Sequence, residues 1–199
     1  MSTAGYGLED KVVVVTGGSR GIGLELAKAL AAQKAKVVIC GRKKEGLDAA
    51  VKAINGGDGV IAVAAHIAKE EDVSALFDAA VKAFGRVDVL INNVGMNLLT
   101  ASVIDTEPAT WTKIIESNLT GTFLCSRTAA MLMREQNRGR IISISSIAGR
   151  KAAPAMGIYG IAKAGIDMLT RVLAFELAQF NIQVNAVAPC MVKTDFSRP

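Results

Sequence analysis

The stretch Lys11–Gly23, KVVVVTGGSRGIG, decides the fold. Its run of valines is typical of a strand buried on both faces of a sheet, and Leu24–Gln33 follows with the pattern of a helix. A glycine-rich turn between a buried strand and a helix lets backbone amides and the helix N-terminus face a diphosphate. The spacing Gly-x-x-x-Gly-x-Gly departs from the commoner Gly-x-Gly-x-x-Gly, so a purely structural turn stays an alternative to a dinucleotide site.

The rest of the chain repeats this alternation of strand and helix, without an internal repeat, a low-complexity tract or a linker. Repeated units of this kind predict a doubly wound parallel α/β sheet of the Rossmann type, with helices on both faces and right-handed crossovers. We therefore expect residues 1–199 to form a single domain. The further strands expected are Lys36–Cys40, Gly59–Ala65, Val87–Ile91, one beginning at Ile141, and Ile182–Ala188, and the longer helices are Lys69–Phe84, Glu107–Gln136 and one from Gly157.

Composition excludes several classes of protein. With 51% hydrophobic and 21% charged residues, 199 residues suffice for one packed core. No run approaches the ~18 apolar residues of a membrane span, and Met1–Lys11 lacks the pattern of a secretory signal, so we expect a cytoplasmic protein without membrane contact. The net charge of +5 is scattered, which argues against nucleic-acid binding. A single histidine, His66, and three widely spaced cysteines offer no spacing typical of a metal site.

A second informative stretch runs from Ile141 to Lys163, beginning IISISSIAG and ending YGIAK. It predicts a buried strand, a turn, and a helix on which Tyr159 and Lys163 lie one turn apart on the same face. An ammonium so placed favours the phenolate and lowers the tyrosine pKa of about 10, which suits general acid or base catalysis. Ser146, at the carboxyl end of the strand, can hydrogen-bond a substrate oxygen beside the phenol. In isolation, an ordinary surface pair and turn-forming serines explain this pattern more often than a catalytic site does.

Further positions bear on ligand binding. Gly41-Arg42 follows the second strand, where many dinucleotide folds carry an acid for the ribose 2′-hydroxyl; an arginine there suits a 2′-phosphate. His66, after the third strand, favours a structural or adenine-side contact over catalysis. The asparagines of Asn92–Gly95 can bond neighbouring backbone, which favours a structural role. Asn118, on the apolar side of its helix, must find partners either in a neighbouring loop or in a polar site.

Together these motifs resemble the short-chain dehydrogenase/reductase family from Leu8 to about Arg198. Thr16–Gly23 resembles the family's cofactor loop and Asn92–Gly95 its Asn-Asn-Ala-Gly segment, while the catalytic tetrad corresponds in order and spacing to Asn118, Ser146, Tyr159 and Lys163. The resemblance implies an enzyme that uses NADP(H) to interconvert a carbonyl and an alcohol. The cofactor-binding residues that it implies are Gly17, Ser19, Arg20, Gly21, Ile22, Gly23, Arg42, His66, Ile67, Asn93, Gly95, Tyr159, Lys163, Pro189 and Thr194.

The resemblance also implies a role for each member of the tetrad. Tyr159 would pass a proton to or from the substrate oxygen, and Ser146 would hold that oxygen. Lys163 would bind the nicotinamide ribose and lower the tyrosine pKa, and Asn118 would support a water in a proton relay. Thr194 would contact the carboxamide of the cofactor.

Two residues depart from the family pattern. Val94 replaces the usual alanine, and Cys190 replaces the glycine that usually follows the proline after the sixth strand. Because cysteine lacks the freedom of glycine at positive φ, we expect the nicotinamide-side loop to differ. Ala65–Lys69 and Lys193–Arg198 resemble the carbonyl and retinal reductase branch, and the similarity to 3-oxoacyl-carrier-protein reductases is nearly as good.

Two alternatives to this function remain on the same scaffold: a non-catalytic dinucleotide-binding sensor, and an epimerase or dehydratase. The partners expected are a small carbonyl or alcohol substrate and further copies of the chain, in a dimer or tetramer, with no nucleic acid. We also expect the natural chain to continue beyond Pro199, because the usual closing helix and last strand would need a dozen residues or more. The substrate itself is not predicted, since its pocket depends on variable loops.

Overall fold

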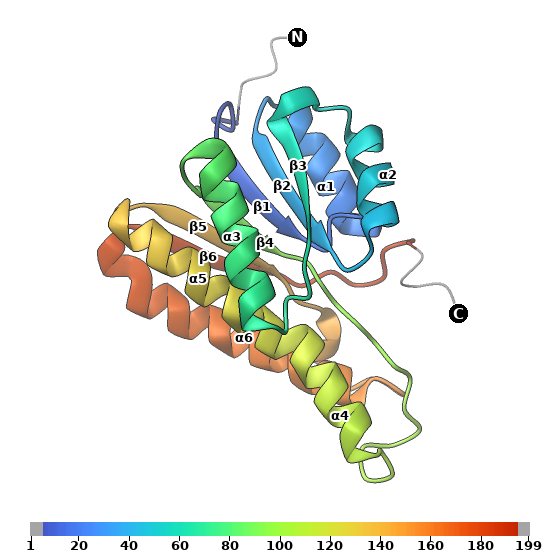
Figure 1. Cartoon of the computed structure of the whole chain (residues 1–199). Helices are drawn as coiled ribbons and strands as arrows, with labels where there is room; N and C mark the ends of the chain where they lie inside the picture. The colour runs from blue at the N-terminus through green and yellow to red at the C-terminus, as the bar shows by residue number, and fades with distance from the viewer. Residues whose placement is uncertain (1–5, 195–199) are drawn as a thin grey trace.

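The chain forms a six-stranded parallel sheet with the strand order β3-β2-β1-β4-β5-β6 and helices on both faces (Figure 1). The computed structural model describes residues 6–194. The strands are β1 (Val12–Thr16), β2 (Lys36–Gly41), β3 (Val60–Ala64), β4 (Val89–Asn92), β5 (Gly139–Ile144) and β6 (Ile182–Val187). The predicted doubly wound parallel sheet is therefore confirmed. Within residues 6–194, no helix has the length and apolar character needed to cross a membrane.

The helices are divided between the two faces by the order of the strands. The chain passes from β1 to β2 to β3 in one direction and from β4 to β5 to β6 in the other, and right-handed crossovers then place the helices on opposite faces. The helical segments are α1 (Gly21–Ala32), α2 (Lys44–Ile54), η1 (Gly57–Gly59), α3 (Glu70–Phe84), α4 (Pro108–Ile115), η2 (Glu116–Thr120), α5 (Gly121–Glu135), η3 (Ile147–Gly149), α6 (Gly157–Leu177) and η4 (Ala178–Phe180).

The valine run of β1 belongs to two separate cores. Val13 and Val15 join the apolar cluster that includes residues of α1 and α2. Val14 joins the cluster that includes residues of α3, α5 and α6. Successive side chains of a strand point to opposite faces, so a central strand covered on both sides must be apolar at every position.

The segment Glu107–Gln136, predicted as one helix, contains a π-helical turn. Helix α4, the π turn η2 and helix α5 follow one another without a break. Asn118 lies in η2, and its amide Nδ2 donates to the carbonyl of Ile114 at 2.8 Å. A π turn widens the helix by one residue, and such turns are frequent at functional sites.

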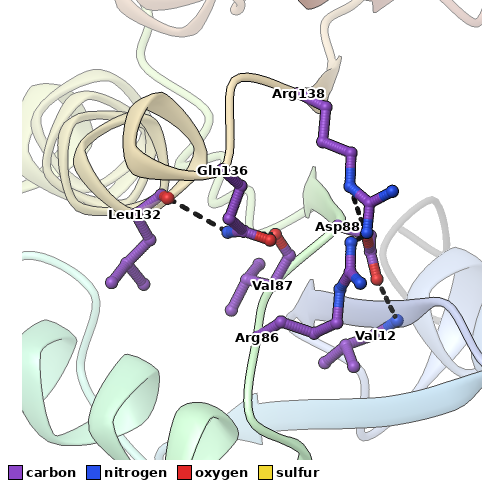
Figure 2. Close-up of polar contacts among 7 residues, drawn as sticks. All are labelled: Val12, Arg86, Val87, Asp88, Leu132, Gln136 and Arg138. Atoms are coloured by element: carbon purple, nitrogen blue, oxygen red, sulfur yellow. Dashed lines mark hydrogen bonds and ion pairs between the residues drawn. The ribbon is translucent and has the colours of Figure 1, made fainter.

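Polar side chains join the elements at the end of the sheet where the strands begin (Figure 2). Asp88 is 7% exposed, accepts a hydrogen bond from the backbone amide of Val12 at 3.0 Å, and pairs with Arg86 and Arg138. Gln136, after α5, donates to the backbone carbonyl of the residue before Asp88 at 3.2 Å. These contacts fasten β1, β4 and the end of α5 at the edge opposite the strands' carboxyl ends.

The strand order also locates the place for a ligand. Strands β1 and β4 are neighbours whose following segments lead away to opposite sides of the sheet. In open α/β sheets, ligands bind outside the carboxyl ends of the strands at such a switch point. The glycine-rich turn follows β1 here, and Asn93–Gly95 follows β4.

Candidate active site

A cavity of about 880 Å³ opens at the carboxyl ends of the strands. Its size falls in the range typical of cofactor and substrate sites. The structure brings most of the predicted site residues together around it, namely Gly17, Ser19, Arg20, Ile22, Arg42, His66, Ile67, Asn93, Gly95, Ser146, Tyr159, Lys163, Pro189 and Thr194. Gly21, Gly23 and Asn118 do not line it.

The glycine-rich turn is shaped for close approach of the backbone. Gly17 has a φ of +68°, a conformation that side chains with a Cβ rarely adopt. A Cβ on Gly23 would lie 2.3 Å from the carbonyl oxygen of Gly17, so α1 can begin against the turn only with a glycine there. Arg20, which precedes α1, makes no side-chain capping bond. The first amides of α1 are therefore available to an anion.

Asn93 supports this turn from the neighbouring strand. Its side-chain amide donates to the carbonyls of Thr16 at 3.0 Å and Gly17 at 3.2 Å, and its backbone amide donates to the Thr16 hydroxyl at 3.0 Å. The backbone amide of Val94 donates to the same hydroxyl at 3.2 Å. The side chain of Asn93 thus holds the glycine-rich turn in shape, which agrees with the structural role expected from the sequence.

Ser146, Tyr159 and Lys163 lie close together in the lining of the same cavity. Ser146 follows β5, where its hydroxyl accepts from the backbone amide of Ala148 at 3.2 Å and also hydrogen-bonds the Tyr159 side chain. The ammonium of Lys163 lies 5.5 Å from the centre of the Tyr159 ring and donates to the carbonyl of Ile144 at 2.8 Å. Tyr159 is 8% exposed and Lys163 is 2% exposed.

Burial changes the proton affinities of both groups. It raises the pKa of Tyr159 above its ordinary value, and the hydrogen bond from Ser146 opposes this rise. It lowers the pKa of Lys163 to about 8, and the carboxylate of Asp167 opposes that fall. In the protein alone, loss of solvation thus outweighs any lowering of the tyrosine pKa by Lys163, whose effect on the phenol stays a prediction. The phenol stays protonated at neutral pH, as a proton donor requires.

Asn118 hydrogen-bonds neighbouring backbone groups and does not line the cavity. Its side-chain oxygen accepts from the backbone amide of Met96 at 3.2 Å, and its amide donates to the carbonyl of Met96 at 2.8 Å. Of the two alternatives, the bonds to a neighbouring loop are observed. This loop carries Gly95, where an added Cβ would lie 3.6 Å from both the Asn118 oxygen and the Lys163 ammonium nitrogen. Asn118 thus fixes the backbone beside Lys163.

The cavity also carries positive charge on exposed side chains. Arg20 and Arg42 are exposed and line it together with Ser19 and Gly41. His66 lines the cavity too, but its backbone amide and ring Nδ1 form hydrogen bonds within the turn before α3. The backbone amide of His66 donates to Asp72 at 2.7 Å, and its Nδ1 accepts from the following turn at 3.3 Å. This bonding agrees with a structural contact rather than a catalytic one.

Sequence similarity decides the family. A profile of the family described as short chain dehydrogenase matches residues 11–199. The chain belongs to the short-chain dehydrogenase family. Members of this family are oxidoreductases that use a nicotinamide dinucleotide.

Individual relatives agree with this assignment. The chain is 37% identical to dehydrogenase/reductase SDR family member 4 of Bos taurus over 96% of its own length and 69% of the bovine protein. It is 42% identical to a 3-oxoacyl-[acyl-carrier-protein] reductase of Synechocystis over 96% of its length and 77% of that protein. The solved 3-ketoacyl-(acyl-carrier-protein) reductase of Brucella melitensis, complexed with NADH, superposes with a TM-score of 0.91 at 34% identity, covering 95% of this chain and 79% of that one.

Several lining residues of this short-chain dehydrogenase were not predicted from its sequence. Most are apolar, and they come from the loops after β4, β5 and β6. Loop conformation decides which of them face the cavity, so sequence spacing gave no signal. They include Val94, Met96, Leu99, Ile147, Ala152, Ala153, Met156, Met191 and Val192.

The two departures from the family pattern have modest consequences in the structure. Val94 packs against the glycine-rich turn, where its Cγ2 would lie 3.1 Å from a Cβ added at Gly17. Cys190 lines the cavity and is exposed, and it is not among the residues with positive φ. The loop at Cys190 therefore does not use the backbone conformation that only glycine adopts freely.

Proposed function

We propose that this short-chain dehydrogenase uses NADP(H) to interconvert a carbonyl and an alcohol, with Tyr159 as the group that gives and takes the proton. The observation that carries the proposal is the meeting of Ser146, Tyr159 and Lys163 on one wall of the cavity, with Ser146 hydrogen-bonded to the tyrosine. A proton donor beside a bound nicotinamide is the chemistry that reduction of a carbonyl requires.

The glycine-rich turn that lines the cavity fits a dinucleotide. The close approach of Gly23 to Gly17 leaves backbone instead of side chains at the start of α1, where a diphosphate would lie. When bound, NADPH would supply the hydride for reduction of the carbonyl, and NADP⁺ would accept it in the reverse direction. Arg20 and Arg42 would hold the 2′-phosphate, and Lys163 would hold the nicotinamide ribose. The choice of NADP over NAD rests on the two arginines.

The raised pKa of Tyr159 supports the reductive direction. A phenol that is protonated at neutral pH can donate to a substrate oxygen as negative charge develops there. Ser146, which contacts the same phenol, would hold that oxygen within reach. The ammonium of Lys163 would stabilise the tyrosinate left after the transfer.

The substitution Tyr159→Phe tests the proposal. It keeps the ring and removes the proton donor, so we expect a loss in rate on the order of 10²–10⁴-fold with NADPH binding nearly unchanged. Rates would be measured by NADPH oxidation over diketones, retinal, steroids, sugars and acyl thioesters. Tyr6→Phe is the matched control, since Tyr6 is 81% exposed. A Tyr159→Phe variant within a few-fold of the parent would refute the role of the tyrosine.

Lys163→Met tests the second part of the site. One side chain is proposed to hold the ribose and to support the tyrosine, so the variant should lose both rate and NADPH affinity. Calorimetric titration with NADPH measures the affinity independently of turnover. An unchanged affinity would remove the ribose contact from the proposal.

The proposal extends to a homo-oligomer in the cytoplasm. Exposed apolar side chains on α5 and α6 support self-association, with Phe123 at 45%, Met168 at 55% and Phe175 at 87% exposure. The three free cysteines, two of them buried, support a reducing compartment. Light scattering of the purified protein measures the mass in solution, and a monomer at micromolar concentration would contradict the first point.

A further inference from the structure

We propose that Asp167, one helical turn beyond Lys163, is a positioning residue that keeps the lysine charged and fastens the Ser146 loop to α6. This inference rests on the proposed function of Tyr159 and Lys163. The spacing Tyr159-x-x-x-Lys163-x-x-x-Asp167 places all three side chains on one stripe of α6. Tyr159 and Lys163 line the large cavity, whereas Asp167 lines a separate cavity of about 230 Å³.

Asp167 is a largely buried carboxylate that makes few hydrogen bonds. Its side chain is 10% exposed, and Oδ2 accepts from Nε of Arg150 at 3.3 Å. Its other oxygen is buried and has no hydrogen-bond partner within residues 6–194. Arg171 lines the same small cavity. A buried carboxylate is unfavourable unless neighbouring cations offset it, so Asp167 and the cations around it depend on each other.

Arg150, the ion-pair partner of Asp167, lies in the loop after β5 that also carries Ser146. Arg150 comes four residues after Ser146, and the segment between them lies directly on α6. The Ser145 hydroxyl donates to the carbonyl of Lys163 at 3.3 Å, and a Cβ on Gly149 would lie 2.8 Å from the backbone of Lys163. The ion pair of Arg150 with Asp167 therefore fastens the far end of the segment that places Ser146 against the tyrosine.

The carboxylate also acts on the charge of Lys163. Burial lowers the pKa of this lysine to about 8, and Asp167 is the group that opposes the fall. On α6 the other titratable neighbour is Tyr159, which is neutral at this pH. Strand β5 presents the uncharged carbonyl of Ile144, and the loop after β4 presents the backbone of Gly95. Two cations come from the loop after β5: Arg150, paired with Asp167, and Lys151, which lines the large cavity.

Two substitutions separate the electrostatic role from simple fastening. Asp167→Asn removes the negative charge and leaves Arg150 without its partner, so the midpoint of the Lys163 titration should fall by about 0.5 to 1 pH unit. Arg150→Gln removes the positive charge and leaves the carboxylate in place, so the midpoint should rise. Both variants break the same ion pair, and a purely mechanical role would make them shift in the same direction.

The midpoint is read directly by carbon-13 NMR of the ε-carbons in lysine-labelled, cofactor-free protein. The Lys163 signal is assigned by its absence in Lys163→Met. Glu70→Gln is the matched control, because Glu70 forms an exposed pair with Arg127 at 2.7 Å between α3 and α5. This measurement needs neither turnover nor NADPH, so its result is independent of the proposed function.

Opposite shifts in the two variants support the proposal. Shifts in the same direction, or midpoints within about 0.2 unit of the parent in both, would overturn it. If Asp167→Asn does not fold, Arg150→Gln alone decides, because only the proposed charge effect raises the midpoint. In active enzyme, the pH at which NADPH affinity declines should move with the midpoint in each variant. If the NMR midpoints shift as expected but the pH dependence of NADPH affinity does not, the effect of Asp167 on the function of Lys163 is refuted. Its electrostatic effect on the Lys163 pKa would still stand.

Discussion

The cofactor preference is open to a direct test at the end of β2. The double substitution Gly41→Asp with Arg42→Ser places a carboxylate where the sequence lacks one and removes a neighbouring cation. A Cβ at Gly41 would lie 3.4 Å from the Ser19 hydroxyl and from Leu47, which is close to ordinary contact, and Gly41 has no positive φ. The exchange should therefore leave the fold intact, and any change in affinity can be assigned to the new charges.

The size of the effect follows from the two arginines. Charge-assisted hydrogen bonds to a phosphate contribute roughly 1.5–3 kcal/mol each, and Arg20 and Arg42 are both exposed, which lowers that figure. We expect the parent to prefer NADPH over NADH by about 10²-fold, equivalent to some 3 kcal/mol. In the double variant the carboxylate repels the 2′-phosphate and accepts from the ribose hydroxyls, so the preference should reverse.

Calorimetric titration of NADPH and NADH into both proteins measures the four affinities. Lys43→Ser is the matched control, because Lys43 is an adjacent exposed cation that does not line the cavity. It should keep the parental preference. Equal affinities of the parent for the two cofactors would refute the argument, as would a double variant that still prefers NADPH.

Further predictions concern stability, pH and thiol reactivity. Asp88→Ala should lower the free energy of unfolding, measured in urea, by about 3 kcal/mol. The substitution leaves the Val12 amide and the Arg86 guanidinium without their acceptor at the start of the sheet. The folded pKa of Lys163, about 8, lies below the unfolded 10.5. The parent should therefore gain up to roughly 3 kcal/mol over Lys163→Met as pH rises between these values; a constant difference would contradict the lowered pKa. Cys190 alone should react quickly with a thiol reagent, and NADPH should protect it, whereas Cys40 and Cys125 should react only on unfolding, because burial raises their pKa values. Fast labelling of a second thiol would contradict the burial.

The features of the fold that depend on local pattern were predictable from the sequence. The valines of β1 had to be apolar at every position because the strand is covered on both faces, and this fixed its place at the centre of a parallel sheet. The carboxyl ends of parallel strands gather at one edge, so residues far apart in sequence, such as Gly17, Ser146 and Pro189, had to line a common cavity.

Asn118 shows what local pattern leaves undecided. Its place on the apolar side of a helix required hydrogen-bond partners, but a period of 3.6 residues cannot predict the π turn in which Asn118 lies or the bond from its amide to the Ile114 carbonyl. The bonds to Met96 depend on how a distant loop is folded. Sequence spacing therefore predicted that Asn118 has hydrogen-bond partners, but only the tertiary structure identifies them.

The tyrosine pKa shows the same limit in electrostatic terms. The spacing of Tyr159 and Lys163 fixes their separation, and separation alone predicts that the ammonium favours the phenolate. The burial of the two side chains decides the direction of their pKa shifts, because both groups are almost fully buried and each loses the solvation of its charged form. The lysine is moreover directed to the carbonyl of Ile144. The same four-residue spacing, continued once more, reaches Asp167. The group that opposes the fall in the Lys163 pKa was therefore visible in the sequence. Its importance was not, because a carboxylate acts strongly on its neighbour only when the fold withdraws both from water.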